Sequence, residues 1–128
     1  MTLEMNDSII FDDFNKQFEI LDGTKGVYNY SDVLRVCICN EKANHRGKGT
    51  PFTAVLPNGP LPAGIFSYPY LFVGIKITLK NNTVLGLYIS KNRTMLNTDQ
   101  YNTDKNHAKI VLKKFNTIIE QKKVVIRN

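Results

Sequence analysis

The sequence has few cysteines, no long apolar run and no basic stretch at its N-terminus, and each shortage excludes a class of protein. Its longest apolar-rich run, residues 71–79, is interrupted by Lys76 and is far shorter than the roughly 20 residues that a membrane-spanning helix requires. Acidic residues precede the first apolar pair, Ile9-Ile10, whereas a secretory signal carries basic residues there. We therefore expect a cytoplasmic protein with no transmembrane segment.

The two cysteines, Cys37 and Cys39, are too few for a disulfide framework or a zinc site. They stand two apart in a predicted strand, where a disulfide between them would be strained. With His45 and His107 they do not reproduce the ligand spacing of a zinc finger. We expect both to be free thiols buried on a core face, and we expect neither a metal nor another cofactor.

Motifs for catalysis are also scarce. The glycine-containing stretch 45–51 lacks the GxxxxGK[ST] pattern of a phosphate-binding loop. Asp12 and Asp13 are adjacent acids, but neighbours in a turn point apart and no third acid follows at a metal-ligand spacing. They are interpreted as residues of a hairpin turn. The sequence therefore predicts a protein that is not an enzyme.

The chain contains enough apolar material for one domain, residues 1–128, because 42% of its residues are hydrophobic. Its charge is unevenly divided along the sequence. Residues 1–34 carry seven acids and two lysines, whereas residues 35–128 carry fifteen bases and four acids. Such a division can attract nucleic acid or an anionic membrane, or it can let the acidic edge of one molecule meet the basic edge of another.

Alternation of polar and apolar residues predicts a β-rich fold. The segment 28–40 is apolar on both sides and is predicted to be the central strand. The most clearly defined hairpin turns at Asn81-Asn82. Strands are predicted at residues 8–11, 16–21, 28–40, 70–80 and 83–90. In the strand 70–80, alternation places Val73, Ile75, Ile77 and Leu79 on one face.

One amphipathic helix is predicted at about residues 103–121. Its apolar stripe must lie on the sheet, and Lys105, Lys109 and Lys113 follow one another on the opposite side. The stripe consists of Ala108, Val111, Leu112, Phe115, Ile118 and Ile119.

Residues 43–69 form an irregular insert that is first basic and then rich in proline. Three basic residues are candidate anion contacts: Lys42, Arg46 and Lys48. Six apolar residues are candidate partner contacts: Phe52, Leu56, Leu61, Ile65, Phe66 and Tyr68. Two interpretations remain open. Either a partner protein or a second copy covers this patch, or the insert folds back and plugs the open end of a barrel.

Two stretches resemble a bacterial family of uncharacterised proteins with a pleckstrin-homology-like (PH-like) domain. The first has the pattern IxFDDxxKxFxI from Ile9 to Ile20, followed by YxYSDVL from Tyr28 to Leu34, and the second is IKITLxNN from Ile75 to Asn82. The resemblance covers about residues 8–42 and 70–121. It implies a mainly β fold, a two-sheet barrel or sandwich of about six to seven antiparallel strands closed by one C-terminal helix. We expect this chain to lack the short oligomerisation motif that often follows this domain in the family.

These observations predict a non-enzymatic interaction module that acts through protein–protein contacts or as a homo-oligomer. The alternative is a basic protein that binds nucleic acid or anionic lipid, for which the lysines of the predicted helix are the motivation. That face offers no aromatic residues for stacking, so nucleic acid is not favoured. A phospholipid head group is unfavoured as well, because the first predicted hairpin loop is acidic.

Overall fold

The structure is a computed structural model that describes residues 2–5, 7–43, 46, 52, 55–56 and 70–127; of residues 2–5, 55–56 and 122–127 it describes the backbone alone. Four short strands come first, then one turn of 3-10 helix and a long strand. Two further strands and a long helix follow the insert. The elements are β1 (Thr2–Met5), β2 (Ile9–Asp12), β3 (Gln17–Ile20), β4 (Gly26–Asn29), η1 (Tyr30–Asp32), β5 (Val33–Lys42), β6 (Val55–Leu56), β7 (Leu71–Leu79), β8 (Val84–Tyr88) and α1 (Asp99–Arg127).

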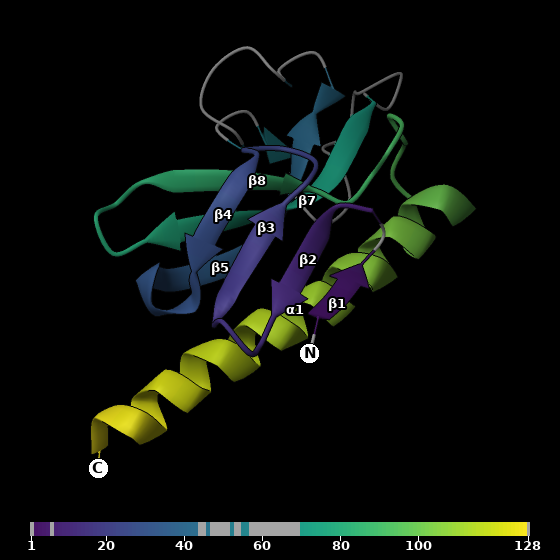
Figure 1. The fold of residues 1–128 in the computed structure, drawn as a ribbon. Coiled ribbons are helices and arrows are strands. Elements are labelled where there is room, and N and C mark those ends of the chain that lie inside the picture. Colours follow the sequence, from purple (N-terminus) through teal and green to yellow (C-terminus); the bar gives the residue numbers. More distant parts are fainter. Residues whose placement is uncertain are drawn as a thin grey trace.

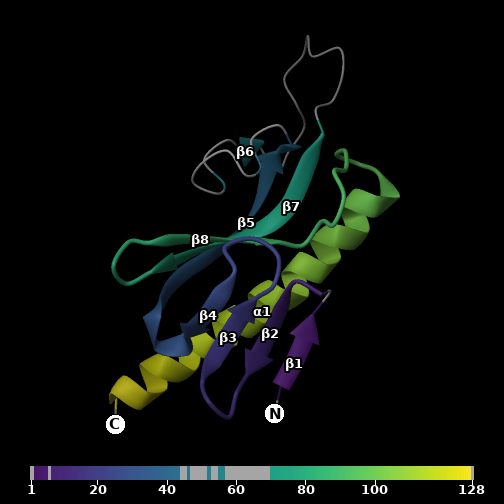
Figure 2. The same cartoon turned by 45° about the horizontal axis from the view of Figure 1, so that its top comes forward.

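The strands form two antiparallel sheets (Figure 1). The first has the order β1-β2-β3-β4 and the second β6-β5-β7-β8, so each sheet has four strands, with β1 and β6 each at an outer edge. In both ribbon views α1 runs behind the first sheet, and its C-terminal end extends past the strands (Figures 1 and 2). The predicted mainly β fold with one C-terminal helix is confirmed. The described strands remain two sheets, however, and do not form the closed barrel that was one form of the prediction.

The two sheets meet at one corner, where the link between β3 and β4 pairs with β8. Gly23 forms an isolated antiparallel bridge with Leu87, and the backbone N–H of Thr24 donates to the carbonyl of Gly86 at 2.8 Å. A Cβ atom at Gly23 would overlap the Gly86 carbonyl, and Gly23 has a φ of +129°. Only glycine suits this corner, which brings Asp22 next to the second sheet.

One apolar core lies between the sheets and the helix. The side chains of β7 that face the core are completely buried: Leu71, Val73, Ile75 and Ile77. The rings of Phe11 and Phe18 from the first sheet pack edge-on against Phe115 of α1, with centroids 5.1 and 5.2 Å apart. The predicted inward face of this strand and the predicted apolar stripe of the helix are confirmed. No helix in the described part of the chain is long and apolar enough to cross a membrane.

The predicted central strand 28–40 is wrong in its connectivity. The chain leaves the first sheet after Asn29, makes one turn of 3-10 helix and enters the second sheet at Val33. The turn buries the ring of Tyr30, whose hydroxyl donates to Asp13 Oδ1 at 2.8 Å. The turn residues continue the polar and apolar pattern of their neighbours. A prediction based on alternation alone therefore gives one strand in place of two strands that belong to different sheets.

The prediction that both cysteines fill the core is also wrong. Pairing between β5 and β7 shifts register between Val33 and Arg35. After this bulge the alternation changes phase, so Val36 and Ile38 face the core. Cys37 is exposed and Cys39 is half-buried, and both are free thiols as expected.

The helix is longer than predicted, since it begins at Asp99 and ends at Arg127. The first turn contains Asp99, whose negative charge suits the N-terminal end of a helix, and the hydroxyl of Thr98 accepts the backbone N–H of Tyr101 at 3.2 Å. Strand β1 was not predicted, and it pairs with β2 from Thr2 opposite Asp12 to Met5 opposite Ile9.

Candidate functional site on the outer face of the second sheet

The face of the second sheet that points away from the core carries most of the chemically distinctive residues. We call it the outer face and define it by eight residues: Cys37, Cys39 and Glu41 of β5, Phe72, Gly74 and Lys76 of β7, and Gly86 and Tyr88 of β8. Strand pairing fixes their rows. Cys37 lies opposite Lys76 and Cys39 opposite Gly74, while Glu41 lies opposite Phe72.

A buried carboxylate is the centre of this face. Glu41 is 0% exposed, its Oε1 accepts the hydroxyl of Tyr88 at 2.6 Å, and its Oε2 accepts the backbone N–H of Phe52 at 2.5 Å. A buried charge is costly unless strong hydrogen bonds compensate for its lost hydration, and both oxygens have a donor here. Burial, and then the hydrogen bond to Glu41, raise the pKa of Tyr88 above the ordinary tyrosine value. We call the hydrogen bonds from Tyr88 and Phe52 to this carboxylate the Glu41 anchor.

Arg46 lies beside the Glu41 anchor in a fixed position. Its guanidinium carbon is 4.5 Å from the centre of the Phe72 ring and 4.2 Å from that of Tyr88, which are cation–π distances. Its Nη2 donates to Asp22 Oδ1 at 2.6 Å. The other carboxylate oxygen of Asp22 is 3.3 Å from Nζ of Lys91. Asp22, placed by the glycine corner, thus joins the start of the insert to the sheet.

Phe52 completes the cluster and is 3% exposed. Its backbone has a φ of +61°, an uncommon conformation for a side chain of this size, and its ring lies 5.2 Å from that of Tyr88. A Cβ atom at Gly74 would overlap the Phe52 ring and approach the Leu87 carbonyl to 2.5 Å. The glycine in β7 therefore makes the space that Phe52 fills.

The insert leaves and rejoins the sheet at one place. Lys42 lies opposite Leu71 at the end of the β5–β7 ladder, and the backbone N–H of Ala43 donates to the carbonyl of Tyr70 at 3.0 Å. Tyr70 is 46% exposed, with the guanidinium of Arg93 4.4 Å from its ring centre. Between these ends the backbone of β6 pairs with the other edge of β5.

The structure brings together only part of the predicted contacts. Arg46 and Phe52 meet at the Glu41 anchor, where Phe52 is buried beneath the surface and Arg46 is engaged by Asp22. Lys42 is exposed at the end of the ladder. The backbone of Leu56 pairs with Asn40, and its side chain lies outside the described residues. The remaining candidates also lie outside them: Lys48, Leu61, Ile65, Phe66 and Tyr68.

Sequence reasoning did not find Asp22, Glu41 or Tyr88 as members of one site. They come from a turn and two strands that are far apart in the chain, and no local pattern connects them. The one available signal was Glu41 itself, the single acid of β5. Its partners depend on the corner at Gly23 and on the bulge in β5.

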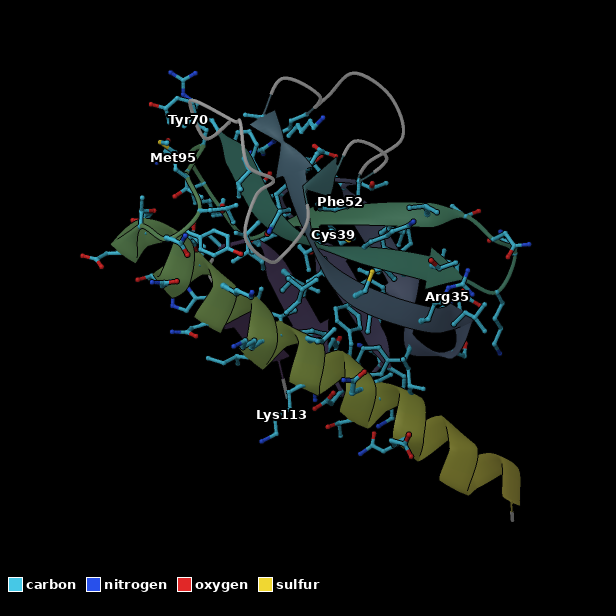
Figure 3. The ribbon with its side chains drawn as sticks, turned by 180° about the vertical axis from the view of Figure 1, so that it is seen from behind. Arg35, Cys39, Phe52, Tyr70, Met95 and Lys113 are labelled. Carbon is cyan, nitrogen blue, oxygen red and sulfur yellow. The ribbon has the colours of Figure 1, made fainter. Side chains whose placement is uncertain are left out.

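The two thiols lie next to the Glu41 anchor on the same face. Sγ of Cys37 and Sγ of Cys39 are 3.5 Å apart. Burial, and then the neighbouring Cys37, raise the pKa of Cys39 to about 12, while the positive charge of Lys76 acts in the opposite direction. Figure 3 shows Phe52 of the insert close to Cys39 of the second sheet, whereas Lys113 projects from α1 away from that sheet.

The adjacent acids belong to the first hairpin turn, as predicted: Asp12 is the last residue of β2 before the turn, and Asp13 lies in the turn itself. Asp12 accepts the backbone N–H of Asn15 at 3.1 Å and its side-chain amide at 2.8 Å. Asp13 binds Nζ of Lys114 at 2.8 Å, and this lysine, followed by the hydroxyl of Tyr30, lowers the pKa of Asp13. Among the described residues there is no group of three histidine, cysteine or acidic side chains that could hold a metal ion.

Comparison of the chain with family models, curated proteins and solved structures finds no match.

Proposed function

We propose that this chain is a non-enzymatic interaction module of the PH-like kind, and that it presents the insert 43–69 to a second copy of itself. The two antiparallel sheets and the C-terminal helix support the comparison with PH-like domains. Binding residues in proteins commonly lie on loops that a rigid scaffold holds in place. Here the scaffold is the second sheet, and the Glu41 anchor is the point of attachment.

The observation that carries this proposal is the full burial of Glu41 against the backbone of Phe52. Desolvating a carboxylate is expensive, and a simple solvent-exposed loop needs no such attachment. Arg46 adds a second attachment six residues earlier in the insert, through Asp22 and two aromatic rings. Both predicted features of the insert, a basic and an apolar residue, are used to hold it to the sheet.

The sequence beyond Phe52 supports self-association as the purpose of that attachment. It contains four apolar candidates within residues 61–68, and the insert ends at the exposed Tyr70. Apolar groups of this number are costly to leave in water, and a second copy would cover them. The acidic first third of the chain and the basic remainder provide complementary charges for two copies.

Light scattering coupled to size-exclusion chromatography tests the proposal. In the test variant a glycine-serine stretch of equal length replaces residues 57–69, which leaves Arg46, Phe52 and the backbone contact between Ala43 and Tyr70 in place. We expect the natural chain to be an oligomer and the variant to be a folded monomer whose thermal unfolding midpoint no longer depends on protein concentration.

The matched control is Phe14→Ser, which removes the most exposed large apolar side chain of the described residues, at 83%, from a different part of the surface. It should leave the oligomer intact. If the natural chain is a monomer at all concentrations tested, or if the insert variant associates equally well, the proposal is wrong.

A second candidate function is binding of a nucleic-acid backbone by α1. Lys109 and Lys113 are both exposed one helical turn apart, as predicted, and Lys113 projects away from the sheets (Figure 3). Of the neighbouring lysines, Lys114 is paired with Asp13 and Lys105 lies 5.7 Å from the Tyr101 ring centre. Gel shifts with duplex DNA and single-stranded RNA test this function, because phosphate contacts weaken steeply with added salt. Binding that Lys109→Gln with Lys113→Gln does not reduce would exclude the helix as its site.

A further inference from the structure

The strongest unassigned chemistry of the molecule is the pair of thiols on the outer face. Cys37 and Cys39 are the only cysteines of the chain, and the bulge in β5 turns both away from the core. Cys37 is exposed and Cys39 half-buried, so the pair is open to solvent on one side. Their sulfur atoms are 3.5 Å apart, which is close enough for one atom to be bonded to both.

We propose that Cys37 and Cys39 form a two-thiolate binding site for Cu(I). Thiolates are soft ligands and favour this soft monovalent ion over Mg²⁺, Ca²⁺ or Mn²⁺. Cu(I) is stable with two sulfur ligands in a nearly linear arrangement. The exposed Cys37 supplies the slightly larger separation that this arrangement needs by rotating about its Cα–Cβ bond.

The ligand number distinguishes Cu(I) from zinc at this site. Zinc in a structural site takes four ligands, and in a catalytic site three ligands and a water. Within the part of the chain that the structure describes, no third histidine, cysteine or acidic residue forms a cluster with the thiol pair. A two-ligand ion is therefore the better match to what the outer face provides.

The surroundings of the pair match the charge of the complex. Two thiolates and one Cu(I) carry a net charge of −1, and Lys76 lies directly opposite Cys37 on β7. Arg35 is a further positive charge two residues before Cys37 on the same strand, whereas Glu41, two residues after Cys39, acts against thiolate formation. We therefore assign Lys76 as the residue whose positive charge compensates for the negative charge of the complex.

Proton balance gives the binding a pH dependence. Each thiol that binds as thiolate releases its proton, and Cu(I) neither gains nor loses an electron in the process. The apparent affinity is therefore expected to rise with pH.

The experiment is an anaerobic competition for Cu(I) between the natural chain and the coloured chelator bicinchoninate, with both thiols first shown to be free by thiol titration. We expect the chain to withdraw one equivalent of Cu(I), and we expect Cys37→Ser and Cys39→Ser each to lose that equivalent. Lys76→Gln should weaken the affinity by about tenfold, the smaller of the effects usual for groups next to a metal ligand.

Two control variants test whether a thioether sulfur or an imidazole nitrogen, in place of the thiols, binds the copper. Met95→Leu and His45→Gln should bind as the natural chain does, and circular dichroism establishes that every variant is folded. X-ray absorption of the loaded chain should show two sulfur neighbours at the copper.

Three outcomes would each overturn the proposal. One is that the natural chain withdraws no copper while both thiols are free. Another is that Cys37→Ser with Cys39→Ser competes as well as the natural chain. The last is a copper centre with three or four sulfur ligands shared between two chains. The first two outcomes do not bear on self-association through the insert, because the thiol pair and residues 57–69 are changed separately.

Discussion

Both faces of the second sheet are partly buried, but different kinds of side chain cover them. The inner face consists of aliphatic side chains from β7 and β8 that pack on α1 and on the aromatic rings of the first sheet. The outer face is covered near Glu41 by a charged and aromatic cluster, in which each oxygen of a buried carboxylate has a donor. Further along the same strands it is open and carries two thiols.

This difference indicates what each face contributes. The inner face supplies stability through apolar area, and hydrophobic side chains of similar volume can replace one another there at modest cost. The outer face determines which segment packs on it, because the groups that donate hydrogen bonds to Glu41 have to come from Phe52 and Tyr88 at fixed positions. The cluster thereby attaches one particular segment, the insert, to one particular place.

The largest expected effect is on the inner face. Phe115→Ala removes a fully buried ring that contacts Phe11 and Phe18, and we expect a loss of about 4 kcal/mol in the free energy of unfolding. Urea unfolding followed by circular dichroism measures it. The control Phe14→Ala removes an exposed ring and should change stability by no more than about 0.5 kcal/mol. Similar losses in the two variants would contradict the assignment of the core.

The Glu41 anchor should give the next largest effect. Glutamine offers one acceptor oxygen and one amide that only donates, so Glu41→Gln leaves the proton of either the Tyr88 hydroxyl or the Phe52 N–H without an acceptor. We expect a loss of about 2 kcal/mol, and a similar loss for Tyr88→Phe. In the double variant the remaining oxygen still serves Phe52 and no phenol is left unpaired, so its loss should fall short of the sum by about 1 kcal/mol.

High pH tests the same cluster without changing the backbone. The raised pKa of Tyr88 means that the folded state favours the neutral phenol. Its contribution is fully present below the ordinary tyrosine pKa of about 10 and is lost as pH rises through the folded value. The natural chain should therefore lose more stability than Tyr88→Phe between about pH 9 and pH 11. Tyr30, whose pKa is also raised, contributes equally to both proteins. Equal losses of stability in the natural chain and in Tyr88→Phe would show that Tyr88 does not cause this pH dependence.

Arg46 should contribute less, because its side chain is partly exposed. Arg46→Gln removes both the ion pair with Asp22 and the contacts with two rings, and we expect a loss of about 1 kcal/mol. Arg46→Lys keeps the charge but not the flat guanidinium, so an intermediate loss is expected. Thermal unfolding of the three proteins in low and high salt separates the ionic part from the rest. A Lys variant that matches the natural chain would show that only charge matters.

The smallest effect is expected far from the outer face, at the ion pair between Lys114 and Asp13. Lys114→Met should cost under about 1 kcal/mol, because this pair is partly exposed. It should raise the pKa of Asp13 toward its ordinary value, since Lys114 is the main cause of the lowering. The stability that Asp13 provides is present above the ordinary carboxyl pKa and is lost as pH falls through the lowered value. A carboxyl titration by NMR measures the shift, and Lys113→Met, an exposed neighbour, should leave it unchanged.

The elements of the inner face were largely predictable from the sequence, because period and composition are local. Alternation placed Val73, Ile75 and Ile77 on one side of a strand, and spacings of three and four placed Val111, Phe115 and Ile118 on one side of a helix. Both predictions are confirmed. The hairpin at Asn81-Asn82 followed from turn chemistry, and Asn82 adopts the positive φ that such a turn needs.

The residues of the outer face could not be predicted, because the alternation of polar and apolar residues does not reveal which side chains of β5 point outward. A bulge after Val33 reverses which side of β5 faces the core, and so it moves Cys37 and Cys39 outward. Glu41 looks like an isolated acid until the corner at Gly23 brings Asp22 close and Phe52 arrives from the insert. Asp22, Glu41 and Phe52 are connected through space and not through any sequence pattern.

Hydrogen exchange at the backbone amide of Phe52 tests the central claim most directly. This N–H donates to a completely buried carboxylate, although Phe52 lies in the irregular insert and outside any strand. We predict that it is protected nearly as strongly as the amides of β7, and that Glu41→Gln reduces its protection without reducing theirs. Exchange of the Phe52 amide at the rate of an unstructured peptide in the natural chain would contradict the attachment of the insert to the outer face.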